Sequence, residues 1–170
     1  MTPPHDLLYA SEQELMEIRG IGRSKASQLL ASLQLARILN MPKEAPTVIR
    51  SPKDVYDLLR TEMEYLRQEV FKVLFLNSKN HIIAIETLSQ GSLNASIVHP
   101  MIVFREACKR SASSIICAHN HPSGIPDPSP EDIRLTERLV QAGEVIGVSV
   151  IDHIIIGQQR FVSLKEQGLI

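Results

Sequence analysis

"SSIICAHNHPSGIPDPSPED", residues 113–132, passes from an apolar run through a proline-rich loop to an acidic segment. The apolar run is typical of a buried strand that would deliver His119 at its end. Ser129 followed by Pro130 is typical of a helix start, with an N-cap residue before a proline at the first helical position. The stretch therefore predicts a strand, a stiff loop and a helix in succession.

The histidines of this stretch, together with its last acid, suit a metal ion. Residues i and i+2 at a strand end project to the same side, so His119 and His121 could meet one cation. Asp132 would stand in the first turn of the following helix. Two imidazoles and one carboxylate are a frequent zinc set that leaves a fourth position for water. An open position on zinc suits a hydrolase.

Each of these residues also has an ordinary structural interpretation. A single histidine at a strand end is more often a hydrogen-bonded or surface residue. Asp132 near a helix N-terminus is favoured by the helix dipole in any case, and Ser129 could serve only as a cap. From the residues alone, both interpretations remain open.

The chain from about residue 48 alternates between strand and helix patterns. "SPKDVYDLLRTEM" begins with Ser51 as an N-cap and Pro52 at the first helical position. "NSKN" is a turn between two strands. Strands are predicted at 69–77, 81–88, 94–98, 113–119, 148–157 and 161–164, and helices at 52–63, 102–110 and 130–143, the last stopped by Gly143. Because strands alternate with helices, an α/β domain is expected.

The N-terminal segment is predicted to be helical. Ser11 and Glu14 fit a capping box for a helix that should stop at Gly20. Helical spacing of apolar residues predicts a longer helix from about Lys25 to Leu39. The prolines that follow indicate a linker. The expected organisation is a helical segment at 1–42, a linker at 43–50 and the α/β domain at 51–170.

Composition narrows the class of protein. The net charge is -1 and the pI is about 6.6, which gives no global attraction to nucleic acid or to an anionic membrane. Cys108 and Cys117 have no C-x-x-C spacing, so a reducing compartment is expected. The N-terminus lacks a signal-peptide pattern, and no apolar run approaches the roughly 20 residues of a spanning helix. These features predict a cytoplasmic protein without membrane contact.

The spacing of the motif resembles that of a known family. His-x-His, seven residues, Ser, two residues and Asp is the signature of the JAMM metalloproteases, also called MPN domains, and "HNHPSGIPDPSPED" fits it throughout. The flanks "VLFLNSKN", "LTERLVQAGEVIGV" and "DHIIIG" resemble the bacterial RadC family, long labelled DNA-repair proteins. The resemblance covers residues 48–170. It implies a mixed sheet flanked by helices, as in the cytidine-deaminase-like fold, and a bound zinc ion. The H-x-E and P-C-x-x-C motifs of the zinc deaminases themselves are absent from this sequence.

The resemblance also implies roles for further residues. A glutamate at the start of the first core strand acts as general base in the family, which favours Glu69 over Glu86. Ser129 would stabilise the oxyanion, and amide or isopeptide bonds in a protein or peptide would be cleaved. The pair Asp152–His153 either orients a ligand or bonds to neighbouring backbone. The alternative function is a DNA-associated accessory protein with a structural or vestigial metal site.

"IRGIGRSKASQLL" resembles the hairpin of helix-hairpin-helix DNA-binding modules. Gly20 and Gly22 would allow a tight turn, so that amides at the next helix start point at a phosphate. Arg23 and Lys25 would add positive charge, and the contact would be independent of DNA sequence. Residues 1–45 contain five basic and five acidic side chains, a poor balance for a stand-alone DNA binder. The alternative is a small helical packing or protein-interaction unit.

Overall fold

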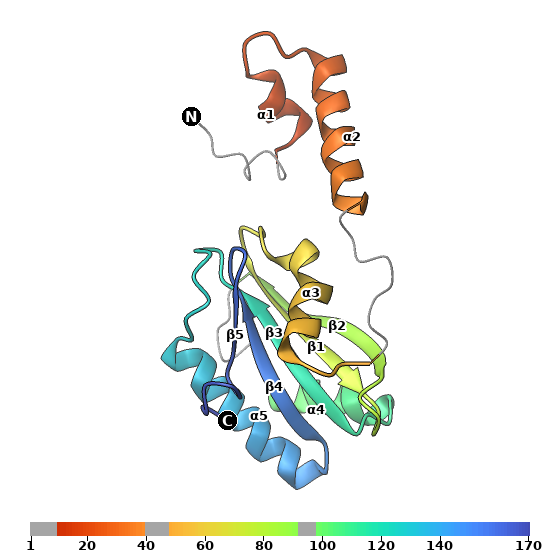
Figure 1. The fold of residues 1–170 in the computed structure, drawn as a ribbon, viewed down its shortest axis with the longest axis vertical. Helices are drawn as coiled ribbons and strands as arrows, with labels where there is room; N and C mark the ends of the chain where they lie inside the picture. Colours follow the sequence, from red (N-terminus) through yellow and green to blue (C-terminus); the bar gives the residue numbers. More distant parts are fainter. Residues whose placement is uncertain (1–9, 40–47, 92–97) are drawn as a thin grey trace. The chain divides into compact units, whose positions relative to one another are not determined.

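Residues 10–39, 48–91 and 98–170 are described by a computed structural model of the chain (Figure 1). Contacts between residues divide the chain into two compact units, Met1–Lys43 and Glu44–Ile170. The smaller unit is helical in its described part, and the larger unit contains the sheet.

In the described residues of the larger unit, five strands form one mixed sheet: β1 (Glu69–Leu76), β2 (Ile82–Gly91), β3 (Ser114–Asn120), β4 (Ser149–Ile156) and β5 (Phe161–Ser163). Their order across the sheet is β2-β1-β3-β4-β5. β3 and β4 run parallel, and the other neighbours are antiparallel. This topology confirms the predicted α/β class with a mixed sheet.

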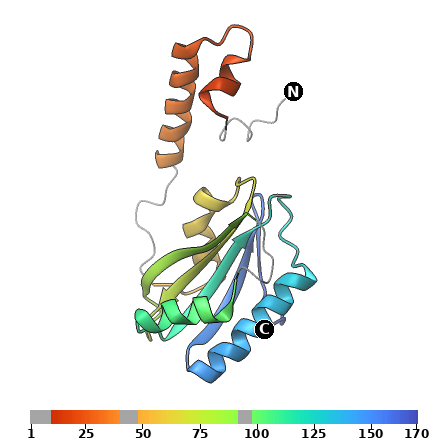
Figure 2. The same cartoon turned by 180° about the vertical axis from the view of Figure 1, so that it is seen from behind.

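Helices cover both faces of this sheet: α3 (Pro52–Met63), α4 (Pro100–Lys109) and α5 (Pro130–Ile146). α3 lies on one face (Figure 1), and α4 and α5 lie on the other (Figure 2). The apolar side chains of α3 belong to one buried cluster, and those of α4 and α5 belong to a second. The sheet therefore separates two cores.

β1 shows why the strand pattern was readable in the sequence. Phe71, Val73 and Phe75 face the core that contains α4 and α5, whereas Val70 and Leu74 face the core that contains α3. All five side chains are buried. A strand that is covered on both faces has a nearly continuous apolar sequence, as "EVFKVLFL" does.

The predicted turn "NSKN" joins β1 and β2. Asn77 accepts hydrogen bonds from the backbone N–H groups of Lys79 and His81 through its side-chain oxygen. Asn80 adopts a positive φ of 57°, a conformation that asparagine tolerates better than most residues. The strand predicted at 94–98 falls almost entirely on residues 92–97, which lie outside the described residues.

The prediction that α5 stops at Gly143 was wrong. The helix continues to Ile146, and Gly147 ends it with a φ of 82° in the left-handed region. Gly143 is instead a packing position within the helix. A Cβ there would stand 2.4 Å from the carbonyl oxygen of Val148 and 3.2 Å from the ring of Phe104.

Gly143→Ala is expected to destabilise the protein despite alanine's better helix propensity. Alanine gains about 1 kcal/mol in a helix interior, but overpacking against a fixed backbone oxygen costs about 1–3 kcal/mol. Denaturant unfolding measures the difference, with the exposed neighbour Glu144→Ala as the control. A Gly143→Ala midpoint equal to that of the control would show that the Val148 carbonyl and the Phe104 ring can move away from the added methyl group without cost.

The smaller unit contains α1 (Glu12–Met16) and α2 (Arg23–Leu39). The predicted capping box of Ser11 and Glu14 is present. However, α1 ends at Met16 and does not reach Gly20, because the chain turns where the N–H of Ile18 donates to the carbonyl of Leu15. Gly20 has a φ of 92° and completes this turn. Among the described helices of the chain, none is long and apolar enough to cross a membrane.

Candidate metal centre

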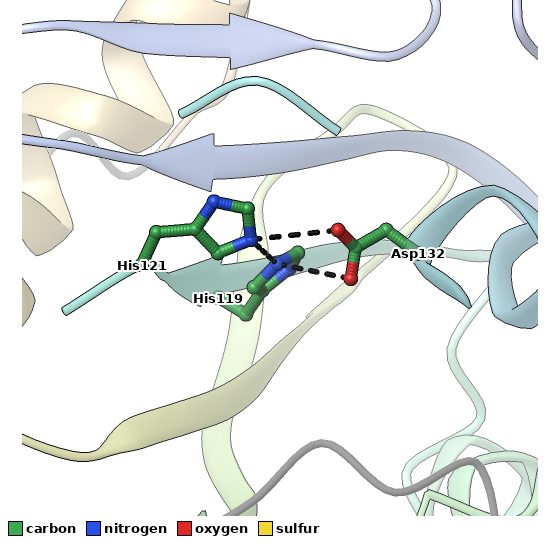
Figure 3. A group of neighbouring side chains, drawn as sticks. All are labelled: His119, His121 and Asp132. Atoms are coloured by element: carbon green, nitrogen blue, oxygen red, sulfur yellow. Dashed lines mark hydrogen bonds and ion pairs between the residues drawn. The ribbon is translucent and has the colours of Figure 1, made fainter. Parts of the chain in front are cut away.

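Three side chains meet at the end of β3 and the start of α5. His119 is the second-last residue of β3, His121 follows the strand, and Asp132 lies in the first turn of α5. One ligand atom from each lies within 4.8 Å of the others. Figure 3 shows both imidazoles and the carboxylate pointing toward one another. The structure thus brings together the three residues that the sequence pattern selected.

The β3–α5 loop is fastened to the end of β4. His121 donates its backbone N–H to the carbonyl of Ile156, and Gln158 donates its own to the carbonyl of Gly124. Gly124 has a φ of 76°, which lets the loop reverse direction. A Cβ on Gly157 would stand 2.6 Å from the carbonyl oxygen of Gly124, so glycine is required for this close approach. The loop therefore presents His121 from a fixed backbone.

The ligand atoms have the mutual spacing of a metal site. His119 Nε2 lies 3.0 Å from His121 Nε2, and the carboxylate oxygens of Asp132 lie 3.3 Å and 3.4 Å from these two nitrogens. Ligand atoms each about 2.0 Å from a tetrahedral ion are separated by roughly 3.3 Å. The side chains therefore need little rearrangement to hold one cation.

The protonation of His121 is set by its other nitrogen. Nδ1 lies 2.8 Å from the carbonyl oxygen of Ile125, which can only accept a hydrogen bond. Nδ1 therefore carries a proton, and in the neutral ring Nε2 presents a lone pair to His119 and Asp132. A lone pair facing a carboxylate is stable only when a proton or a metal cation stands between them. The hydrogen bond with Asp132 accordingly raises the pKa of His121.

Asp132 is held by the start of its own helix. Ser129 donates its N–H and its hydroxyl to Oδ2 of Asp132 at 2.8 Å and 2.7 Å, and Asp132 returns its N–H to the hydroxyl oxygen. Burial acts to raise the pKa of this carboxyl, but hydrogen bonds with His121 and Ser129 lower it further than burial raises it. Asp132 is therefore a carboxylate at neutral pH, and Ser129, the N-cap of α5, donates hydrogen bonds to it.

His119 is fully buried, so its surroundings favour a neutral ring. Burial holds the pKa of His119 well below its usual range. Phe71 stacks on the ring with centroids 6.3 Å apart. A neutral imidazole in an apolar setting binds a divalent cation without first releasing a proton.

Glu69 begins β1 on the same side of the sheet as the three ligands. It precedes Phe71 by two residues, and Phe71 pairs with His119 across β1 and β3. The negative charge of Glu69 contributes to the raised pKa of His121. Asn120 fixes the backbone on both sides of Glu69, because its side chain accepts the N–H of Val70 at 2.8 Å and donates to the carbonyl of Gln68 at 3.1 Å.

Glu86, the other candidate base, lies elsewhere in the sheet. It pairs with Val73 of β1, two residues further along the strand than Phe71. Its carboxylate contacts Arg110 at 2.6 Å, and Arg110 also contacts Glu106 at 2.6 Å. The structure therefore places Glu69, and not Glu86, beside the ligand group.

A family model of the RadC-like JAB domain matches residues 49–169. The chain belongs to the RadC-like JAB family. The chain is 52% identical over 159 residues to a UPF0758 protein of Alkaliphilus oremlandii, an alignment that covers 93% of this chain and 68% of the relative. It is 54% identical to UPF0758 proteins of Caldanaerobacter subterraneus, over 95% of this chain and 70% of the relative, and of Bacillus cereus, over 94% and 71%.

The side chains of this RadC-like JAB domain fit a bound metal. Two imidazoles and one carboxylate form a donor set that suits zinc better than the oxygen-only sets preferred by magnesium and calcium. His121 remains partly exposed, with 14% of its side chain accessible. Solvent therefore reaches the group at His121.

Asn120, His153 and Thr136 also join the site; of these, only His153 was singled out from the sequence, as part of the pair Asp152–His153. Asn120 supports Glu69, as described above. His153 lies 2.8 Å from Nδ1 of His119, and Thr136 contacts His153 at 2.6 Å. The pair Asp152–His153 combines both interpretations offered by the sequence: Asp152 accepts the backbone N–H groups of His153 and Lys165, whereas the His153 ring contacts a ligand.

The candidate DNA contacts lie in the smaller unit of this RadC-like JAB chain. The ammonium group of Lys25 donates a hydrogen bond to the carbonyl oxygen of Gly20 at 3.0 Å, and Nε of Arg23 lies 3.4 Å from Oε1 of Glu12. Gly22 has open space around its Cβ position, and its φ lies outside the left-handed region. The two cations thus have partners within the unit, and Gly22 leaves its backbone open to approach.

Proposed function

We propose that this chain is a zinc-dependent hydrolase of the JAMM type that cleaves amide or isopeptide bonds. The main support is the convergence of two imidazole nitrogens and one carboxylate, with Glu69 on the same side of the sheet. Membership of the RadC-like JAB family agrees with this chemistry. A structural zinc site would normally be closed by a fourth protein ligand, whereas the described residues around this group supply three.

Each residue has a proposed task in the reaction. His119, His121 and Asp132 would hold zinc, which supplies a Lewis acid and lowers the pKa of a bound water. Glu69 would take the proton of the attacking water on its carboxylate and pass it to the leaving amine. The hydroxyl of Ser129, which caps Asp132, would turn to the oxyanion of the substrate; one such donor contributes about 3 kcal/mol.

The proposal is tested by comparing protein N-termini in cells that contain the wild type or Glu69→Gln. Cleavage of a peptide bond creates a new N-terminus, which labelling and mass spectrometry detect. We expect a set of N-termini that is present only with the wild type. Identical sets in the two strains would exclude cleavage of peptide bonds and would favour the alternative over a peptidase, namely a DNA-associated accessory protein whose metal site is structural or vestigial.

We also propose that the turn from Gly20 to Lys25 binds DNA phosphates without sequence preference. The supporting observation is the open space beside Gly22. Because the turn is small, binding is expected to be weak, with a salt slope of roughly 0.9 per phosphate contacted. Since Arg23 and Lys25 have partners within the unit, the backbone amides would provide most of the contact.

Gly22→Val is expected to weaken DNA binding more than it weakens folding. A branched side chain would block the approach of a phosphate, while the backbone conformation of Gly22 is open to other residues. Fluorescence titration of a short duplex at low salt measures binding, and a thermal melt measures folding. A folded variant with unchanged affinity, or a wild type that does not bind at low salt, would assign the turn to protein packing.

A further inference from the structure

A chain of three hydrogen bonds runs behind the ligand His119. Nδ1 of His119 lies 2.8 Å from Nε2 of His153. Nδ1 of His153 lies 2.6 Å from Oγ1 of Thr136, and this hydroxyl lies 2.6 Å from the carbonyl oxygen of Asp132. His119, His153 and Thr136 are all fully buried. The chain therefore connects one ligand side chain to the backbone of another, through β4 and α5.

The direction of the protons in this chain follows from its last atom. The carbonyl oxygen of Asp132 can only accept, so the single hydroxyl proton of Thr136 points to it. Thr136 must then accept from His153, which places the proton of that ring on Nδ1. The reverse direction would leave two oxygen atoms 2.6 Å apart with no proton between them, a repulsive contact in a buried site.

The proton position on His153 in turn decides which nitrogen of His119 carries a proton. His153 is fully buried, and its two ring nitrogens face the hydroxyl of Thr136 and the ring of His119 rather than a carboxylate. A neutral imidazole is favoured in such a setting. With its proton on Nδ1, it offers a lone pair at Nε2 and accepts the Nδ1–H of His119. His119 is then left with its lone pair on Nε2, the atom that faces His121 and Asp132 at 3.0 Å and 3.3 Å.

We propose that Thr136 and His153 are positioning residues that hold His119 in the tautomer able to bind a metal through Nε2. Free imidazole can carry its proton on either nitrogen, and a proton on Nε2 would block coordination. Phe71 stacks on the ring of His119 and is T-shaped to the ring of His153, with the centroids of the Phe71 and His153 rings 5.4 Å apart. Because these rings are enclosed, the protein chain and not solvent determines the tautomer. The role proposed for these hydrogen bonds rests on the proposed metal site.

The test begins with zinc affinity of the full-length protein, measured by competition with a chromophoric chelator. Thr136→Val keeps the shape of the side chain and removes the hydroxyl, and an outer hydrogen-bond partner of this kind typically contributes about 10–100-fold to metal affinity. We expect a loss of that size for Thr136→Val and recovery to within about threefold of wild type for Thr136→Ser. Thr61→Val, the same substitution in α3, is the matched control.

The second measurement reads the tautomer directly. Long-range proton–nitrogen NMR spectra of the histidine-labelled, metal-free protein distinguish a protonated ring nitrogen from one with a lone pair. We expect His119 and His153 of the wild type and of Thr136→Ser to be protonated on Nδ1. In Thr136→Val, we expect both rings to shift toward the other tautomer.

The outcomes separate this inference from the proposed function. Failure of the wild type to bind zinc would overturn the proposed metal site. Zinc binding that Thr136→Val leaves unchanged, or a wild-type His119 protonated on Nε2, would overturn the positioning role alone. If Thr136→Val does not fold, the wild-type tautomer and the affinity of Thr136→Ser decide the question.

Discussion

Glu69→Gln is expected to keep its zinc and to lose turnover by about 10²–10⁴-fold, the usual contribution of a general base. Glutamine has the shape of glutamate but cannot take a proton from water. Glu69 is not among the ligand group, so metal content should not change. Turnover is measured on a substrate found by the comparison of N-termini, and zinc is measured by elemental analysis of the same preparation.

Glu86→Gln is the matched control for this prediction. Glu86 also lies on a strand, but its carboxylate pairs with Arg110, away from the ligands. The side chains of Arg110 and Glu86 are 23% and 42% exposed. An ion pair at such an exposed site contributes about 0–1 kcal/mol to stability, so the variant should fold and turn over normally. Loss of turnover in Glu86→Gln together with full activity in Glu69→Gln would move the base to Glu86.

His119→Ala is expected to remove zinc from the purified protein, which in the wild type should carry about one zinc per chain. Replacement removes a direct ligand, so the affinity should fall further than the roughly 10–100-fold expected for an outer partner. His121→Ala should behave in the same way. Elemental analysis after dialysis against a weak chelator measures the metal content.

Asp132→Asn and His81→Ala complete the test of the ligand set. Asparagine keeps the volume of aspartate, and its amide oxygen can still accept the N–H of Ser129 at the start of α5, so Asp132→Asn should fold while it binds zinc more weakly. His81 is exposed immediately before β2, and its replacement should leave zinc content unchanged. Full zinc occupancy in a His119→Ala, His121→Ala double variant would disprove the assignment of the site.

Much of the fold could be predicted because its signals are local. The nearly continuous apolar runs in β1 and β3 indicate burial on both faces. Proline after an N-cap serine marks the starts of α3 and α5. Gly143 shows the limit of such signals. A glycine near the end of a helical pattern usually marks a stop, but here the approach of Phe104 and Val148 requires it inside the helix.

The choice between Glu69 and Glu86 shows how register decides a site. Both are strand glutamates in the sequence, and the family resemblance alone favoured Glu69. The structure adds a physical reason. Phe71 pairs with His119, so Glu69, two residues earlier, lies at the level of the ligands. Glu86 lies further along the sheet and contacts Arg110.

The sequence by itself determined the elements and the ligand candidates, because His119, His121, Ser129 and Asp132 lie within one strand–loop–helix segment whose geometry is local. Only the tertiary structure decided what supports them. Asn120 holds Gln68 and Val70 at a sequence separation of about fifty residues. His153 meets His119, and Thr136 meets His153, only because β4 pairs in parallel with β3 and α5 packs on the sheet. These contacts depend on strand register and helix placement, which sequence periodicity does not encode.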